Sequence, residues 1–167
     1  MKELKNGEKK GYRMTVILSI DPSSAKATKS NTGIVLIENG KLIDYWVVSY
    51  GVKGFKDWFD NNHSNLNYDV SIYEHFEARD NSKSKDNTVL ETIAEIQKLI
   101  PEAEPFRNGG YQTDVPDELL KALGLWKFGK SHHQDVRAAA RLAIFYAMRN
   151  DIEDFVTGVG ELLSERI

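Results

Sequence analysis

Residues 14–37, MTVILSIDPSSAKATKSNTGIVLI, decide the fold that we expect for this chain. They begin with a short run of apolar and β-branched side chains, Val16 to Ile20, which is typical of a buried central strand. Asp21 follows where this run stops. Because Pro22 cannot donate a hydrogen bond to a strand ladder, we expect Asp21 at the C-terminal tip of the strand. An Asp in this position is either a turn-forming residue or a ligand, and the rest of the sequence has to decide between the two.

The next two apolar runs predict an antiparallel hairpin. They cover residues 33–37 and 42–48, and the segment Glu38-Asn39-Gly40-Lys41 joins them. Asn-Gly is the strongest short signal for a tight hairpin turn, because both of its positions accept a positive φ angle. The chain is therefore expected to open with a meander of three strands.

The composition limits the class of protein. The chain has 167 residues, of which 41% are hydrophobic and 28% charged, which is typical of one soluble globular domain. It has no cysteine, which excludes disulfides and thiolate metal sites. No apolar run reaches membrane-spanning length and no signal peptide is recognisable, so we expect a cytoplasmic protein. A net charge of −3 argues against a protein that coats nucleic acid, but it is compatible with an acidic metal site beside basic patches.

The remaining pattern predicts an α/β protein. We expect a mobile N-terminal arm over residues 1–13 and a single domain over residues 14–167. Two further strands are predicted at residues 68–76 and 104–107. Helical periodicity predicts helices at residues 54–62, 88–100, 116–123, 131–148 and 152–167, the last of them weakened by Gly158 and Gly160.

Glu74 departs from the pattern of its own strand. It lies on the same face as Val70 and Ile72, so it points where an apolar core residue is expected. A carboxylate is costly in such a place unless it is paired or bound to a cation. The alternative is that the edge of the sheet leaves Glu74 in solvent.

The helix at residues 131–148 carries polar side chains at the start of its apolar stripe. His132 and Asp135 are three residues apart and therefore neighbours on that face, one turn before it becomes apolar. Arg137 and Arg141 fall on the far side. A lone His in a first turn usually caps the helix or is solvated, whereas a His/Asp pair facing the sheet is more typical of ligands. The stripe itself is made of small residues, Val136, Ala139, Ala140, Ala143 and Ala147.

The order of these features resembles the RuvC-type Holliday junction resolvases, over residues 14–148. No single motif is diagnostic, but the matching motifs occur in the right order and in the right kinds of element. The histidine and the short chain are most similar to the resolvases of bacteriophages. The matching blocks are Ile20-Asp21-Pro22-Ser23-Ser24 with Thr32-Gly33, Ile72-Tyr73-Glu74-His75-Phe76 with Asn81, and His132-His133-Gln134-Asp135-Val136-Arg137-Ala138-Ala139-Ala140.

This resemblance implies a ribonuclease-H-like fold, a mixed five-stranded sheet with antiparallel first three strands, flanked by helices. It also implies a metal-dependent hydrolase that cleaves phosphodiester bonds in branched DNA. Two Mg²⁺ ions, for which Mn²⁺ is expected to substitute, would supply the nucleophilic water and stabilise the leaving oxygen. The ligands implied by the family pattern are Asp21, Glu74, His132 and Asp135.

The chain departs from the family pattern in three places. Ser23 stands where the family usually has Gly, and Val136 replaces the usual Ala. The loop to Thr32-Gly33 is longer by residues 26–30, which could alter contacts with substrate. The tail from Asp151 has no role that the resemblance transfers.

The expected partners are a four-way DNA junction and a second copy of the chain. A junction is two-fold symmetric and two strands must be cut, which favours a homodimer. The helix from Thr88 to Ile100 has a wide apolar arc and is the candidate interface, as in the family. Basic residues close to the acidic positions are candidates for DNA contacts: Lys26, Lys29, Arg79, Lys83, Lys85, Lys127 and Lys130.

Two other classes of protein share these opening features. Sugar kinases and actin-like ATPases also begin with a strand, an Asp, a Thr-Gly loop and a hairpin, but they need a second such domain to close over nucleotide. A non-catalytic nucleic-acid-binding module would keep the fold without needing all four ligands. Other nucleases of the same fold, such as ribonuclease H and packaging nucleases, stay open because a fold does not fix a substrate.

Overall fold

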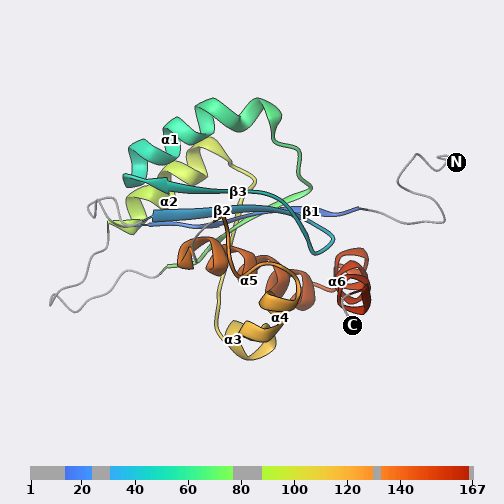
Figure 1. The fold of residues 1–167 in the computed structure, drawn as a ribbon. Coiled ribbons are helices and arrows are strands. Elements are labelled where there is room, and N and C mark those ends of the chain that lie inside the picture. The colour runs from blue at the N-terminus through green and yellow to red at the C-terminus, as the bar shows by residue number, and fades with distance from the viewer. Residues whose placement is uncertain (1–13, 24–30, 77–87, 130–132, 166–167) are drawn as a thin grey trace, which may run out of the picture.

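The structure is a computed structural model that describes residues 14–23, 31–76, 88–129 and 133–165. One sheet lies between two layers of helices (Figure 1). The arm predicted at residues 1–13 lies outside the described residues. Within the described part of the chain, no helix has both the length and the apolar character needed to cross a membrane.

The sheet has five strands in the order β3-β2-β1-β4-β5. β1 pairs antiparallel with β2, and β2 pairs antiparallel with β3, whereas β4 is parallel to both β1 and β5. This confirms the predicted mixed sheet with three antiparallel strands at its start. The bounds are Val16–Asp21 (β1), Asn31–Glu38 (β2), Lys41–Ser49 (β3), Val70–Glu74 (β4) and Glu104–Phe106 (β5).

The turn between β2 and β3 has the predicted geometry. Asn39 has a φ of 46° and Gly40 a φ of 90°, both in the left-handed region that a tight hairpin turn requires. The central place of β1 also follows from its side chains, because Ile17, Leu18 and Ile20 are all fully buried between the two helical layers.

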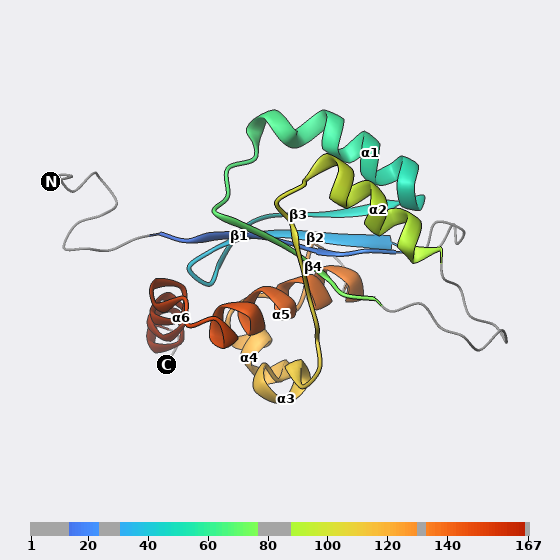
Figure 2. The same cartoon turned by 180° about the vertical axis from the view of Figure 1, so that it is seen from behind.

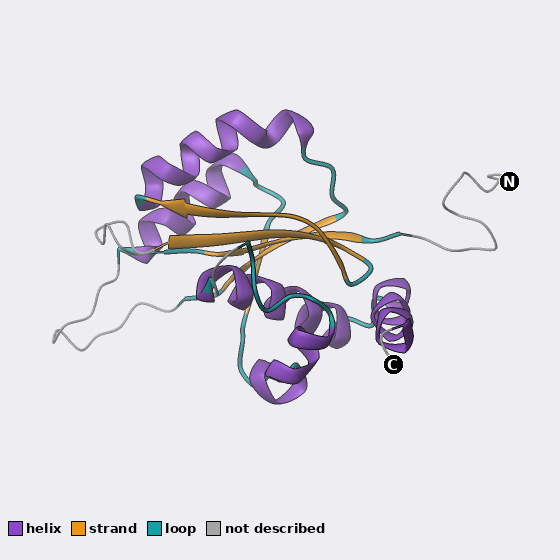
Figure 3. Ribbon diagram, viewed as in Figure 1, coloured by secondary structure: helices purple, strands orange, loops and turns teal. Residues whose placement is uncertain are grey.

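Two helices, Gly51–Asn62 (α1) and Val89–Leu99 (α2), cover one face of the sheet (Figures 1 and 2). The opposite face is covered by Gln134–Arg149 (α5). Beyond α5 lie two short helices, and a further helix packs beside the β2–β3 end of the sheet, as the colouring by secondary structure makes clear (Figure 3). These are Tyr111–Asp114 (α3), Asp117–Ala122 (α4) and Glu153–Glu165 (α6), and a 3-10 turn, His63–Asn65 (η2), follows α1.

Small side chains let α5 lie against the strands. The alanines at 139, 140, 143 and 147 are fully buried in the same cluster as Ile17, Val35 and Ile72. Removing this apolar surface from water stabilises the fold by about 25 cal/mol per Å². The predicted apolar stripe of the long helix is thereby confirmed as the face that packs on the sheet.

Several element boundaries differ from the predictions, among them those of α1, α5 and β4. α1 begins at Gly51 rather than residue 54, because Tyr50, with a φ of 68°, turns the chain directly after β3. α5 begins at Gln134 rather than residue 131, because His133 at its N-cap has an extended backbone with a ψ of 103°. β4 covers Val70–Glu74 instead of residues 68–76.

Candidate active site

Asp21 and Glu74 end two neighbouring parallel strands. Ile20 pairs with Tyr73, so the next residue on each strand reaches the same edge of the sheet. Glu74 shares its face with Ile72, which packs in the cluster under α5. The structure thus confirms that Glu74 points toward the side of the sheet that α5 covers, as its strand pattern predicted.

Asp135 reaches the same place from α5. It is the second residue of that helix, and the helix starts directly over Gly33, the β2 residue that pairs with Asp21. A Cβ atom added to Gly33 would overlap the backbone carbonyl of Asp135 and lie 2.6 Å from the backbone nitrogen of Val136. Only glycine leaves room for this approach, so the Thr32-Gly33 pair sets the position of Asp135.

The loop after β1 is held by two buried hydroxyl side chains. The Thr32 hydroxyl oxygen accepts a hydrogen bond from the backbone N–H of Ser23 at 3.0 Å and lies 2.8 Å from the Ser23 hydroxyl oxygen. These contacts tie the chain after Asp21 back to the start of β2. Ser23, which departs from the family pattern, therefore has a structural role in this chain.

The three acids interact electrostatically. Burial raises the pKa of the Asp21 carboxyl well above its ordinary value, and the neighbouring carboxyls of Glu74 and Asp135 raise it further, with a hydrogen bond between Asp21 and Glu74. Burial also raises the pKa of Asp135, while a backbone hydrogen bond and His133 oppose the rise. The raised pKa means that burial and the neighbouring acids favour the protonated form of Asp21 when no cation is bound.

Asn108 and Tyr111 complete the surroundings of Glu74, and the sequence analysis did not select either of them. The Asn108 side-chain amide donates a hydrogen bond to Glu74 Oε2 at 2.7 Å. Burial raises the pKa of the Tyr111 hydroxyl, and the carboxyls of Glu74 and Asp21 add to the rise, so the Tyr111 ring lies near both acids. The available signal was the position of Asn108 just after β5, at the same edge of the parallel sheet as Glu74.

Arg141 lies on the side of α5 away from the sheet, as predicted, but it is 5% exposed because α3 and α4 cover it. Its guanidinium donates to the backbone carbonyl of Val115 and forms an ion pair with Asp117 at 2.7 Å. This interaction fixes the α3–α4 segment, and with it Tyr111, against α5.

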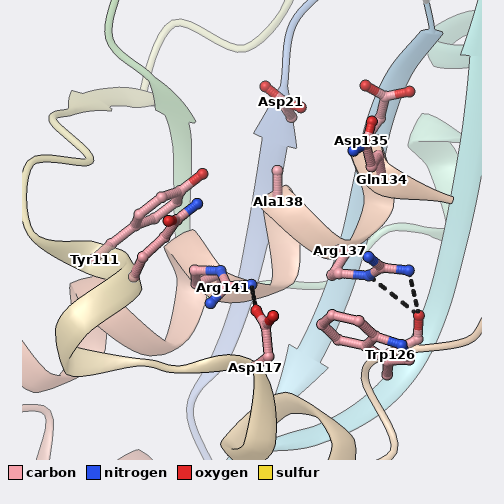
Figure 4. A pocket seen from close by; sticks show the side chains of 10 residues that line it. Asp21, Tyr111, Asp117, Trp126, Gln134, Asp135, Arg137, Ala138 and Arg141 are labelled. Atoms are coloured by element: carbon pink, nitrogen blue, oxygen red, sulfur yellow. Dashed lines mark hydrogen bonds and ion pairs between the residues drawn. The ribbon is translucent and has the colours of Figure 1, made fainter. Parts of the chain in front are cut away.

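A cavity of about 370 Å³ opens beside the acids (Figure 4). Asp21, Gln134 and Asp135 lie at one end, where β1 stops and α5 begins, and Arg137 and Trp126 lie at another. Its remaining lining comes from α3, α4 and the outer side of α5: Tyr111, Gln112, Asp117, Ala138 and Arg141.

Of the four predicted ligands, the structure brings Asp21, Glu74 and Asp135 together. His132 lies outside the described residues. Lys127 is exposed and does not line the cavity, because its neighbours Trp126 and Phe128 are the side chains that turn inward. The other predicted DNA contacts also lie outside the described residues: Lys26, Lys29, Arg79, Lys83, Lys85 and Lys130.

The carboxyl oxygens of these acids are ligands of the chemical type that a divalent cation prefers. Mg²⁺ prefers oxygen ligands, and a dication beside these carboxyls would favour the charged form of Asp21 that burial disfavours. Among the described residues, however, no three His, Asp or Glu side chains already surround one point as closely as a bound metal requires. Completion of the site would therefore need adjustment of Asp135 or a ligand from outside the described residues.

The sheet order, the covering of both faces and the acids at the strand ends define a ribonuclease-H-like fold. Among solved structures, the chain is similar to Thermus thermophilus RuvC in complex with a Holliday junction substrate, with a TM-score of 0.58 and 15% identity over 84% of this chain and 98% of that chain. It is also similar to a second Thermus thermophilus RuvC structure, with a TM-score of 0.52 and 14% identity over 83% and 96% of the two chains. No protein-family model and no curated protein sequence matches the chain.

Proposed function

We propose that the chain is a metal-dependent endodeoxyribonuclease that hydrolyses phosphodiester bonds in branched DNA, as a Holliday junction resolvase of the RuvC type. The observation that carries this proposal is the convergence of Asp21, Glu74 and Asp135 from two parallel strands and the start of a helix. The similarity in fold to a RuvC structure that contains a Holliday junction supports the choice of substrate. A cavity of about 370 Å³ adjoins Asp21 and Asp135.

Asp21, Glu74 and Asp135, with His132 as a fourth ligand, would hold the Mg²⁺ ions. When bound there, the ions would supply a nucleophilic water at neutral pH and stabilise charge on the phosphate and the leaving oxygen. Mn²⁺ is expected to substitute, because it accepts the same oxygen and imidazole ligands.

The residues around the acids prepare them for this role. The Asn108 amide donates a hydrogen bond to one oxygen of Glu74, which restricts the orientation of the carboxyl that also contacts Asp21. Metal binding competes with the proton that the raised pKa favours on Asp21, so metal binding should release protons. Tyr111 and the α3–α4 segment form one side of the cavity beside Asp21 and Asp135.

The experiment that tests this function is cleavage of a labelled four-way junction in Mg²⁺. We expect Asp21→Asn, Glu74→Gln and Asp135→Asn each to lower the cleavage rate at least 100-fold, because each removes a ligand charge. Binding of the junction in EDTA should persist, since basic side chains supply most of the affinity for DNA. The matched control is Asp57→Asn, which changes an exposed Asp on α1, on the other side of the sheet.

His132 is tested in the same assay. If the position needs a metal-binding group rather than an imidazole in particular, His132→Asp keeps measurable cleavage and His132→Ala loses most of it.

Full activity in any of the three acid variants would remove that residue from the site. Junction binding without cleavage in either metal would instead favour a non-catalytic module, and ATP binding would favour the kinase-like alternative.

A further inference from the structure

Arg137 differs from the other arginines of α5 in its partners. Arg141 forms an ion pair with Asp117 at 2.7 Å, and Arg149 forms one with Asp114 at 3.1 Å. Arg137 instead donates through Nε and Nη2 to the backbone carbonyl of Trp126, at 3.3 and 3.2 Å. No carboxylate of a described residue forms an ion pair with Arg137, so its positive charge is not compensated within the described part of the chain.

The Arg137 side chain is nevertheless held in one place. Its guanidinium carbon lies 3.6 Å from the centre of the Trp126 ring, and the Lys121 ammonium lies 4.7 Å from the same centre. Stacking on the ring and the two hydrogen bonds to one carbonyl fix the plane of the guanidinium. Of the five N–H groups of an arginine, about three remain to donate to a ligand.

The position of this cation suggests its ligand. Arg137 lines the same cavity as Asp21 and Asp135, but away from the acidic end (Figure 4). A DNA strand carries a phosphate at each nucleotide, so a strand whose scissile phosphate lies at the acids must place neighbouring phosphates close by. The cavity, at about 370 Å³, is within the range of sites that hold small ligands.

We propose that Arg137, oriented by Trp126, binds a phosphate of the cleaved DNA strand next to the scissile phosphate. This proposal rests on the proposed function and adds a contact outside the metal site. A fixed, planar guanidinium suits a phosphate, because it can donate two parallel hydrogen bonds and adds charge attraction. The contact would hold the strand so that the scissile bond lies at Asp21 and Asp135.

The test compares Arg137→Gln with Arg149→Gln by measuring the affinity for a four-way junction in EDTA at several salt concentrations. Arg149 is the matched control, because it is on the same helix and stacks on Phe145 at 4.7 Å, but it is already paired with an acid. Loss of one phosphate contact lowers the slope of log affinity against log salt by about 0.9. We expect that decrease, with a roughly ten-fold loss of affinity, in Arg137→Gln alone.

A second variant separates binding from folding. Arg137→Lys keeps the positive charge but loses the planar guanidinium with its parallel N–H donors. The slope of log affinity against log salt should therefore stay unchanged, and the affinity should fall only a few-fold. The melting temperature of each variant shows whether the α4–α5 connection is intact. An unchanged slope in a folded Arg137→Gln protein, or an equal loss in Arg149→Gln, would overturn the Arg137 contact while leaving the nuclease proposal standing. Failure of the unmodified protein to bind or cleave any branched DNA would overturn both.

Discussion

At the scale of single residues, the site is built from carboxyls in an unfavourable place. Asp21 is half-buried at the end of β1 beside two other acids, so its charged form is disfavoured in the absence of a cation. Such a group lowers stability and is retained where function needs it. The same property that makes Asp21 costly to the fold makes it a suitable ligand for Mg²⁺.

Asp21→Asn should therefore stabilise the metal-free protein at neutral pH, by about 0.5–2 kcal/mol. The raised pKa means that folded protein holds a proton that unfolded protein loses near pH 4. The stability of the unmodified protein consequently falls as pH rises from about 4 through the folded pKa. The Asn variant lacks this fall, so the two proteins should differ little below pH 4 and most at higher pH. Thermal unfolding in EDTA across this range measures the difference.

Added Mg²⁺ provides the control for this prediction. It should stabilise the unmodified protein, because ligands that bind only the folded state raise its stability, and it should stabilise Asp21→Asn much less. An Asn variant that is less stable than the unmodified protein at pH 7 in EDTA would contradict the prediction.

At the scale of elements, the position of α5 depends on Gly33. The start of the helix presses on this residue so closely that a methyl group cannot be inserted. Gly33→Ala should push the first turn of α5 away from β2 and displace Asp135 from Asp21. We expect cleavage to fall at least 100-fold and stability by about 1–3 kcal/mol, the usual range for overpacking. Cleavage assays and thermal unfolding check these two effects.

α6 shows that a glycine in a helix can be required by packing. Gly158 faces the β2–β3 turn, and a Cβ atom there would overlap the Asn39 carbonyl oxygen and lie 2.7 Å from the Asn39 Cβ. Gly160 has open space around it. Close packing therefore accounts for Gly158, whereas the weakening of the helix by Gly160 stays a prediction. Thr15 donates a hydrogen bond to Asp154 and adds to the docking of α6.

Two alanine substitutions in α6 should consequently have opposite effects. Gly160→Ala should stabilise the protein by about 0.5–1 kcal/mol, because alanine favours the helix more than glycine does. Gly158→Ala should destabilise it by about 1–3 kcal/mol, because the helix must move away from the turn. Denaturant unfolding of the two variants gives both values. If both substitutions change the stability in the same direction, the packing of α6 does not depend on the close approach of Gly158 to Asn39. Gly160→Ala also serves as the control for Gly33→Ala in the cleavage assay.

At the scale of the whole molecule, we propose a homodimer that matches the two-fold symmetry of a junction. Most of the apolar arc of α2 packs internally, where Val89, Ile93 and Ile96 are buried. Leu90 and Leu99 lie on opposite flanks of this helix, half-buried at the edge of the internal cluster. A dimer interface through α2 would therefore use the rim of the arc rather than its centre.

Light scattering at micromolar concentration should give twice the mass of one chain. Ala94→Arg, at an exposed position on α2, should shift the protein toward monomer by placing a charge in the interface. Ser164→Arg, exposed on α6, should have no such effect. A monomeric unmodified protein that still cuts junctions at full rate would contradict the dimer.

The sequence by itself predicted the five strands, the α-helices of the described residues except α3, and the polar residues that stand in apolar places. Asp21 and Glu74 could be selected from it because strand periodicity and the end of an apolar run are local properties, read from a few adjacent residues. The stripe of small apolar residues along α5 likewise predicted which face of the helix packs on the sheet.

Only the tertiary structure decided which distant residues complete the site. Asn108 contacts Glu74 because β5 joins the sheet beside β4, and 34 residues separate the two in sequence. Arg137 is held by Trp126 in the segment before α5, and Arg141 becomes buried because α3 and α4 fold over it. Such contacts depend on the order of strands and on how helices are covered. No local pattern encodes either, because both result from packing among segments far apart in the chain.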